Sequence, residues 1–238
     1  MNTIPKAPHR IDPRKAAIAA MVCWAGFATF VWAVPTGRTQ HFDRIGLLFW
    51  RAGDLRPLGP VKLLEWVRDL TAMGGSLLIT LFTTLAVVAL VWLRCRREAV
   101  LLALTVISGS IVNTLLKAVV GRPRPEIVPH LTEAGGASFP SGHSFNSAST
   151  YIALALAFAA LSPRAGVRHT LIAGAVLLSL AIAWSRVWLG VHWPSDVMAG
   201  WLGGAAWAFT ASAVLYRPAE VMLETAEDIR EHDIRARP

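Results

Sequence analysis

Three short clusters of polar side chains lie beside long apolar runs of this chain, and each contains residue types that can do chemistry. They are residues 117–125 (KAVVGRPRP), 140–143 (PSGH) and 185–196 (SRVWLGVHWPSD). Charged and ionisable side chains are costly next to a membrane, and where they occur they are usually functional. The three clusters are therefore the candidate site of this protein.

The basic residues of the clusters predict an anionic ligand. They are Lys117, Arg122, Arg124 and Arg186. Arginine presents a planar fork that matches phosphate oxygens, and lysine presents a point charge. Ser141 and Gly142 stand at the expected start of an apolar helix, where free backbone N–H groups favour an anion. Together these residues predict a binding site for a phosphate monoester or diphosphate.

Two histidines and one carboxylate supply groups for phosphoryl transfer. His192 and Asp196 are four residues apart, so the carboxylate could hold one imidazole nitrogen and leave the other free to attack phosphorus. His143 is then the candidate general acid for the leaving oxygen. Besides Asp196, the acids near the clusters are Glu126 and Glu133, and they form no group that would bind Mg²⁺. We therefore expect a reaction without a metal ion or other cofactor.

The three clusters resemble the motifs of the type 2 phosphatidic acid phosphatase (PAP2) superfamily, Lys-x6-Arg-Pro, Pro-Ser-Gly-His and Ser-Arg-x5-His-x3-Asp. The resemblance implies a metal-independent lipid phosphatase in which His192 forms a phosphohistidine intermediate. By the same resemblance, Asp196 orients His192, and His143 protonates the leaving group. The resemblance assigns phosphate binding to Lys117, Arg124, Ser141, Gly142 and Arg186. Arg122 lies outside the strict motif and is assigned a supporting contact with the phosphate.

Each cluster also has a simpler interpretation when it is taken alone. Lys117, Arg122 and Arg124 could anchor the end of a span to lipid headgroups. Ser141 could serve only as a helix N-cap, and His192 could form a structural pair with a nearby carboxylate. The joint occurrence of all three clusters on one side of the membrane favours a common site over three unrelated structural roles.

The overall composition indicates which elements must position the clusters. Apolar residues make up 54% of the 238 residues and charged residues 16%, whereas a soluble domain carries about 25% charge. A span needs roughly 17–25 apolar residues, and six runs without a charged residue meet or approach this length. They are residues 16–34, 73–93, 99–116, 145–161, 170–184 and 197–216. We predict an all-α integral membrane protein with a bundle of six transmembrane helices.

The distribution of lysine and arginine predicts the orientation of this bundle. These residues gather in the N-terminal tail, in the turns between spans two and three and between spans four and five, and in the C-terminal tail. Such segments face the cytoplasm, so both termini are predicted there. The three clusters then face the periplasmic side of a bacterial inner membrane. The net charge of +8 is thus explained by topology and a phosphate site, without a nucleic acid partner.

The remaining segments define the domain organisation. Within residues 35–72, apolar side chains from Val61 to Leu70 recur at helical spacing opposite charged ones. This pattern predicts an amphipathic helix in the membrane interface between spans 1 and 2, with a solvated surface helix as the alternative. We predict cytoplasmic tails at 1–15 and 217–238 around a PAP2-like domain at 16–216. In the C-terminal tail, a short helix is predicted from Pro218 to about Arg230.

The expected reaction is dephosphorylation of a lipid phosphate or diphosphate held in the bilayer. Polyprenyl diphosphate (undecaprenyl diphosphate) of the cell envelope is the preferred substrate, and phosphatidylglycerol phosphate, phosphatidic acid and a lipid A phosphate are the other candidates. A lipid-to-lipid phosphotransferase would resolve the same intermediate with a lipid hydroxyl. A transporter would place its charges near the membrane midplane, but the six runs contain no charged residue and no histidine. A non-catalytic lipid-binding protein would not need the complete set of candidate catalytic residues.

Overall fold

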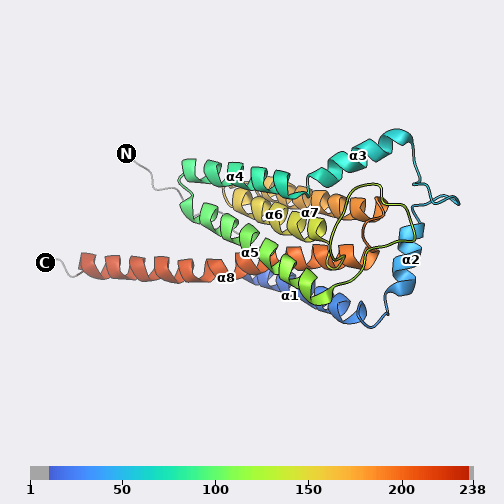
Figure 1. Cartoon of the computed structure of the whole chain (residues 1–238). Coiled ribbons are helices and arrows are strands. Elements are labelled where there is room, and N and C mark those ends of the chain that lie inside the picture. The colour runs from blue at the N-terminus through green and yellow to red at the C-terminus, as the bar shows by residue number, and fades with distance from the viewer. Residues whose placement is uncertain (1–10, 236–238) are drawn as a thin grey trace.

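The computed structural model describes residues 11–235 of the chain and the side chains of residues 11–214. Within this range the chain forms eight helices and no strand. They are α1 (Pro13–Ala33), α2 (Gln40–Leu48), α3 (Val61–Ala72), α4 (Ser76–Trp92), α5 (Arg96–Val120), α6 (Gly142–Ala159), α7 (Ala165–Trp188) and α8 (Pro194–Arg235). The all-α prediction is confirmed for the described residues. Figure 1 shows α1 and α4–α8 running along one another, with α2, α3 and the loop after α5 at one end.

Four of these helices are long and apolar enough to cross a membrane, namely α1, α5, α7 and residues 194–214 of α8. Helices α3 and α4, bent by 50° at the break between them, would together give a fifth span. Helix α6 does not qualify by composition because its buried face is rich in serine and threonine. Length and composition of the described helices therefore support four or five spans, compared with the six predicted runs.

Helix α6 is the centre of the bundle and contacts α4, α5, α7 and α8. Its packing against α8 depends on two glycines of α8 that bring the backbones together. A Cβ atom at Gly204 would overlap the Phe145 carbonyl oxygen, and one at Gly200 would lie 2.6 Å from that of Ser141. Small residues allow such close helix contacts in membranes. The close contact also fixes the start of α6 beside the start of α8.

Several helix ends differ from the predicted spans. Helix α5 continues past the apolar run to Val120 and so includes Lys117, and α7 continues to Trp188 and includes Arg186. Predicted span 73–93 begins later, because residues 73–75 form a turn before α4. The separate C-terminal helix was wrong in its start, since Pro218 lies inside the continuous helix α8. Residues 1–10 of the predicted N-terminal tail and residues 236–238 lie outside the described range.

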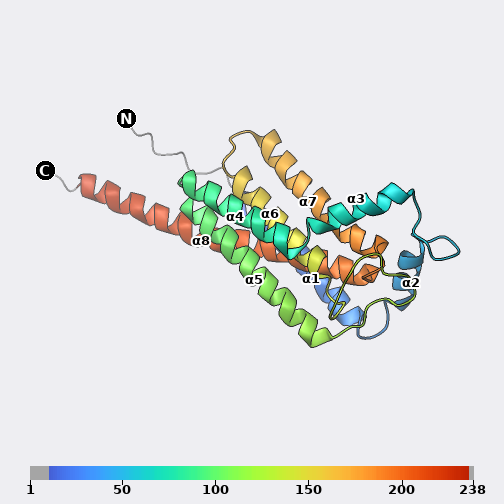
Figure 2. The ribbon, with the colours of Figure 1, turned by 45° about the horizontal axis from the view of Figure 1, so that its top comes forward.

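Residues 35–72 contain two helices, although the sequence predicted one. Helix α3 occupies the predicted amphipathic stretch, with Val67 buried and the Arg68 side chain donating to the Leu131 carbonyl oxygen at 2.6 Å. Helix α2 was not predicted, because its nine residues are too few to show a clear apolar period. Both helices cover the end of the bundle where α5 and α7 stop and α6 and α8 begin (Figure 2).

Candidate active site

The three sequence clusters meet at the end of the bundle that α2 and α3 cover. The first cluster lies at the C-terminus of α5 and in the following loop, and the second forms the start of α6. The third runs from the last turn of α7 to the first turn of α8. Two helix C-termini, two helix N-termini and the loop of residues 121–141 therefore surround one site.

His192 is the central residue of this site, and its side chain is 2% exposed. Its Nδ1 lies 3.2 Å from Ser138 Oγ and 3.5 Å from Asp196 Oδ2. The Ser138 hydroxyl donates to Asp196 Oδ2, so its oxygen must accept from His192 Nδ1–H. A neutral imidazole with its proton on Nδ1 carries a lone pair on Nε2. The hydrogen bonds thus set the tautomer that a nucleophilic Nε2 requires.

The Nε2 face of His192 is occupied by Arg124. Arg124 Nη1 lies 3.0 Å from His192 Nε2 and donates to the Val191 carbonyl oxygen at 2.7 Å. The remaining guanidinium nitrogens donate to the carbonyl oxygens of Gly135 and Gly136 at 2.7 and 3.1 Å. The guanidinium is therefore held by backbone groups beside the position that an anion near Nε2 would occupy.

The surroundings keep His192 uncharged. Burial is the main cause that lowers the pKa of His192, Asp196 opposes it, the nearby cations of Arg124 and Arg186 add to it, and the resulting pKa is about 4. At neutral pH the imidazole is therefore neutral and retains the Nε2 lone pair.

The other predicted phosphate ligands surround this face. Lys117 Nζ donates to the Ala137 carbonyl oxygen at 2.7 Å, and its Cε lies 3.5 Å from the place of a Cβ on Gly142. Arg186 Nη1 donates to Thr71 Oγ1 of α3 at 3.0 Å, while its buried Nε has no hydrogen-bond partner among the described residues. An unpaired buried donor of this kind is a place for an acceptor oxygen.

Ser141 has a role in the fold that the sequence raised as an alternative. Its side chain caps α6 by accepting from the Ser144 N–H at 3.5 Å, and its own N–H donates to the Asp196 carbonyl oxygen at 3.0 Å. The first N–H groups of a helix have no carbonyl partner within it. In α6 these include the N–H groups of Gly142 and His143, and Gly142 lies next to Lys117.

His143 is half-buried against the turn between α3 and α4. A Cβ atom at Gly74 would lie 3.3 Å from its Cδ2, and one at Gly75 would lie 3.9 Å from its Nε2. The Tyr151 hydroxyl holds this turn by donating to the Met73 carbonyl oxygen at 2.7 Å. His143 lies within electrostatic reach of the other candidate residues, which are Lys117, Arg124, Arg186 and His192.

Arg122 has different neighbours from those that the sequence suggested. Its Nη1 donates to Asp196 Oδ1, and its Nη2 donates to Asp43 Oδ2 at 2.6 Å. Sequence reasoning assigned Arg122 to phosphate and did not single out Asp43 or Ser138. Neither missed residue has a sequence signal, since Asp43 precedes its partner Ser195 by 152 residues and Ser138 lies in an irregular loop.

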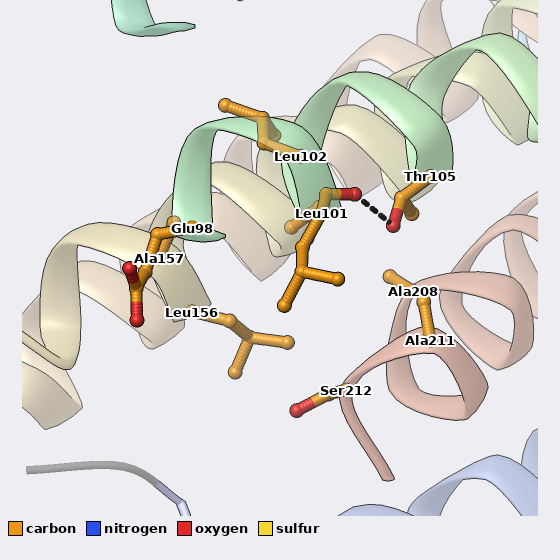
Figure 3. Close-up of a pocket in the computed structure, with 10 residues that line it drawn as sticks. Glu98, Leu101, Leu102, Thr105, Leu156, Ala157, Ala208, Ala211 and Ser212 are labelled. Carbon is orange, nitrogen blue, oxygen red and sulfur yellow. Dashed lines mark hydrogen bonds between the residues drawn. The ribbon is translucent and has the colours of Figure 1, made fainter. Parts of the chain in front are cut away.

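Two hollows in the bundle differ in their relation to this site. One hollow lies between α4, α5 and α6 and is lined by Ser76, Asn146 and Thr150; Asn146 follows His143 by three residues on α6. The other lies at the opposite end of the bundle between α5, α6 and α8 (Figure 3). It is lined mainly by leucine and alanine, and it contains none of the candidate site residues.

The fold and site define a helical integral membrane protein with a buried histidine among fixed cations. Residues 98–219 match the family model of the PAP2 superfamily. A putative undecaprenyl-diphosphatase, YbjG of Escherichia coli, is 32% identical over 157 residues, which cover 63% of this chain and 74% of that protein. The chain therefore belongs to the PAP2 superfamily, and the resemblance seen in its motifs is confirmed.

Two further proteins show how far the similarity extends. Lipid A 1-phosphatase of Rhizobium etli is 35% identical over 133 residues, covering 52% of this chain and 53% of that protein. The chain thus matches about half the length of this relative. The crystal structure of a PAP2 type phosphatidylglycerolphosphate phosphatase from Bacillus subtilis aligns with a TM-score of 0.75 at 23% identity. That alignment covers 82% of this chain and 95% of the other, and it shows a common fold.

Proposed function

We propose that this protein is a lipid phosphatase that works through a phosphohistidine at His192. The observation that carries the proposal is the set of contacts around His192, with Ser138 Oγ at Nδ1 and the guanidinium of Arg124 at Nε2. Since the Ser138 hydroxyl donates to Asp196, these contacts favour the Nδ1–H tautomer with its lone pair on Nε2. A phosphate bound there meets a nucleophile and a fixed cation at once, and charge neutralisation with positioning is most of what phosphoryl transfer needs.

The reaction has two steps that conserve protons. His192 Nε2 attacks phosphorus, a P–N bond forms as the P–O bond to the lipid breaks, and protonated His143 gives its proton to the leaving oxygen. Water then attacks phosphorus as His143 takes a proton from it, and the P–N bond breaks. Inorganic phosphate leaves, and both histidines have returned to their starting protonation.

The remaining candidates hold the phosphate and orient the nucleophile. Lys117, Arg124, Arg186 and the first N–H groups of α6 bind the phosphate oxygens. Asp196 stabilises the cationic imidazole that forms during attack. Ser141 acts by capping α6, and Arg122 acts on Asp196, because both terminal nitrogens of Arg122 contact carboxylates. We propose no cofactor.

The hollow between α4, α5 and α6 supports a lipid substrate. Residues from α4, α5 and α6 line it within the bundle, so a lipid tail can extend there while its headgroup reaches the cations. YbjG, named an undecaprenyl-diphosphatase, matches more of this chain and of its own length than the lipid A 1-phosphatase does. We therefore propose a polyprenyl diphosphate as the first substrate to test, followed by phosphatidylglycerol phosphate, lipid A and phosphatidic acid.

The proposed topology retains six spans in the inner membrane. Helix α6 crosses as the polar centre of the bundle, α4 crosses separately, and α3 lies in the interface on the periplasmic side. Residues 1–15 and 217–238 are then cytoplasmic extensions of the domain at 16–216. The support for this arrangement is that all three clusters lie at one end of the bundle (Figure 2).

Phosphate release from purified lipids tests the proposed function. The panel comprises undecaprenyl diphosphate, phosphatidylglycerol phosphate, phosphatidic acid and lipid A, with His192→Ala as the blank. We expect the highest kcat/KM on undecaprenyl diphosphate and a loss of at least about 10³-fold in the variant, as for removal of a nucleophile. Mass spectrometry should find an acid-labile phosphate on His192 of the wild type.

Three results would contradict parts of this proposal. Turnover of His192→Ala near that of the wild type would exclude the nucleophile, and absence of phosphate release from every lipid would exclude a lipid phosphatase. Transfer of phosphate to an added lipid alcohol without release of inorganic phosphate would instead establish the phosphotransferase.

A further inference from the structure

Asp43 of α2 is a buried carboxylate that the proposed mechanism does not use. Its side chain is 1% exposed, although aspartate is almost never fully buried unless it is paired. Its Oδ1 accepts from the Ser195 N–H at 2.8 Å, and its Oδ2 accepts from Ser195 Oγ at 2.7 Å and from Arg122 Nη2 at 2.6 Å. Both oxygens are thus directed at groups next to the catalytic Asp196.

The first contacts of Asp43 hold the beginning of α8. Ser195 is the second residue of that helix, so its N–H has no carbonyl partner within the helix. Asp43 supplies this partner from a different helix, and its negative charge also suits a helix N-terminus. One turn further along α2, a Cβ at Gly46 would lie 2.8 Å from Pro194 Cγ. Helix α2 is therefore seated directly on the first turn of α8.

The second contact links Asp43 to Asp196 through Arg122. Arg122 Nη1 donates to Asp196 Oδ1 and to Ser195 Oγ, the latter at 2.8 Å. The other oxygen, Asp196 Oδ2, accepts from Ser138 and from the Trp193 N–H at 3.0 Å and faces His192. One oxygen of Asp196 is thus held by the guanidinium, and the other is presented to the imidazole.

The charges explain why two carboxylates share one guanidinium. If Arg122 paired with Asp196 alone, the pair would be neutral and would offer little to a cationic imidazole. With Asp43 on the opposite side of Arg122, the group of three keeps one net negative charge next to His192. The phosphorylated imidazole carries a positive charge among the cations of Arg124 and Arg186, so this negative charge matters most after attack.

We propose that Asp43 is a positioning residue for the phosphoryl transfer, acting on Asp196 through Arg122 and Ser195. Asp43 lies outside the three sequence clusters and comes from the short helix α2, which gives this helix a task in catalysis. The inference rests on the proposed function, since it concerns the same nucleophile. A positioning role differs from a purely structural role because it predicts that replacing Asp43 lowers kcat while the stability of the fold stays unchanged.

The test compares Asp43→Asn with Asp54→Asn, a control at an exposed position where the carboxylate pairs with the exposed Arg56. For Asp43→Asn we expect kcat on the best lipid substrate to fall about 10- to 100-fold, because small misplacements of reacting groups cost this much. KM should stay within about threefold, since the phosphate ligands are unchanged. Asp54→Asn should match the wild type in both constants.

A double-variant comparison shows whether Asp43 works through Arg122. Arg122 contacts the two carboxylates through two separate terminal nitrogens, and Arg122→Lys replaces this planar fork by a single ammonium on a shorter side chain. If both residues act through one bridge, the double variant Asp43→Asn/Arg122→Lys should have a kcat within about threefold of that of the slower single variant. A reduction of kcat in the double variant that equals the product of the two single reductions would overturn the proposal.

Binding of orthovanadate gives a readout that does not depend on turnover. Vanadate mimics the phosphorus at the moment of attack, so Asp43→Asn should weaken its Kd about tenfold or more. If the wild type releases phosphate from no lipid, the proposed function fails, and vanadate affinity still decides the role of Asp43. An unchanged vanadate Kd, or a kcat within twofold of wild type, would refute the proposal. A loss of kcat that only accompanies a lowered melting temperature would also refute it.

Discussion

At the scale of single residues, the proposed chemistry depends on a histidine that stays neutral among cations. The PAP2 motifs place the cations of Lys117, Arg124 and Arg186 near His192, yet His192 is buried away from the solvent that would support a charge of its own. Its Nδ1–H is fixed by the Ser138 oxygen, which is itself oriented by Asp196. In the proposed mechanism, a serine outside the three clusters thus decides which nitrogen of His192 attacks phosphorus.

The lowered pKa of His192 predicts where the acid limb of the pH profile lies. A base with a pKa of about 4 loses its proton at lower pH than an ordinary histidine does, at about 6.5. The reactive neutral form therefore persists as pH falls, and kcat/KM should decline only as pH approaches about 4. The measurement is kcat/KM from pH 4 to 8, corrected for the phosphate ionisation of the substrate followed by ³¹P NMR. A corrected limb near 6.5 would show that burial does not depress this pKa.

The fixed cations predict that chelators will not inhibit the enzyme. Arg124 and Arg186 are held by protein acceptors around the position of the phosphate, and Lys117 adds a third charge. These groups can neutralise the transition state without Mg²⁺. We expect the same kcat after dialysis against EDTA, whereas Arg186→Ala should lower kcat/KM about 10²- to 10³-fold. Activity that is lost in EDTA and restored by Mg²⁺ would contradict this expectation.

At the scale of elements, the site depends on how closely α6 and α8 approach. Gly204→Ala places a methyl group onto the backbone oxygen of Phe145 and must push the helices apart. Overpacking of this kind costs about 1–3 kcal/mol, and each kcal/mol lowers Tm by about 2–4 °C in a chain of this size. Gly174→Ala is the matched control, because a Cβ there meets no atom within 4 Å.

The two glycine variants separate packing from helix propensity. Gly174→Ala should keep or slightly raise Tm, since alanine favours helix over glycine. Gly204→Ala should lower both Tm and kcat, because the starts of α6 and α8 carry Gly142 and Asp196. Equal melting temperatures for the two variants would show that the close backbone contact is not required.

Helices and their order could largely be predicted from the sequence, because long apolar runs without charge are typical of membrane-spanning helices. The helix ends could not, since Lys117 and Arg186 are helical even though they end the apolar runs. The three clusters were found because their residues lie close together in sequence. Asp43 and Ser138 were missed because their partners are distant in sequence and become visible only when α2 and the loop of residues 121–141 are in place.

At the scale of the whole molecule, the candidate site lies at one end of the bundle, and we propose that the other end faces the cytoplasm. The site residues and helices α2 and α3 lie at one end, and the turns from α4 to α5 and from α6 to α7 lie at the other (Figure 1). The second end carries arginines such as Arg94 and Arg164, as the positive-inside rule requires of a cytoplasmic surface. If that end faces the cytoplasm, the candidate site lies at the opposite membrane surface, and a lipid substrate would reach it from the outer leaflet.

This orientation predicts which engineered cysteines react from outside the cell. In a Cys95→Ser background, Glu133→Cys marks the loop at the site end, and Arg164→Cys marks the opposite turn; both positions are exposed. A membrane-impermeant maleimide should label the first variant in intact spheroplasts and the second only after the membrane is broken. Because the two positions lie at opposite ends of one bundle, the reverse pattern would place the phosphate site in the cytoplasm. Labelling of both before lysis would mean that the described helices do not cross the membrane as proposed.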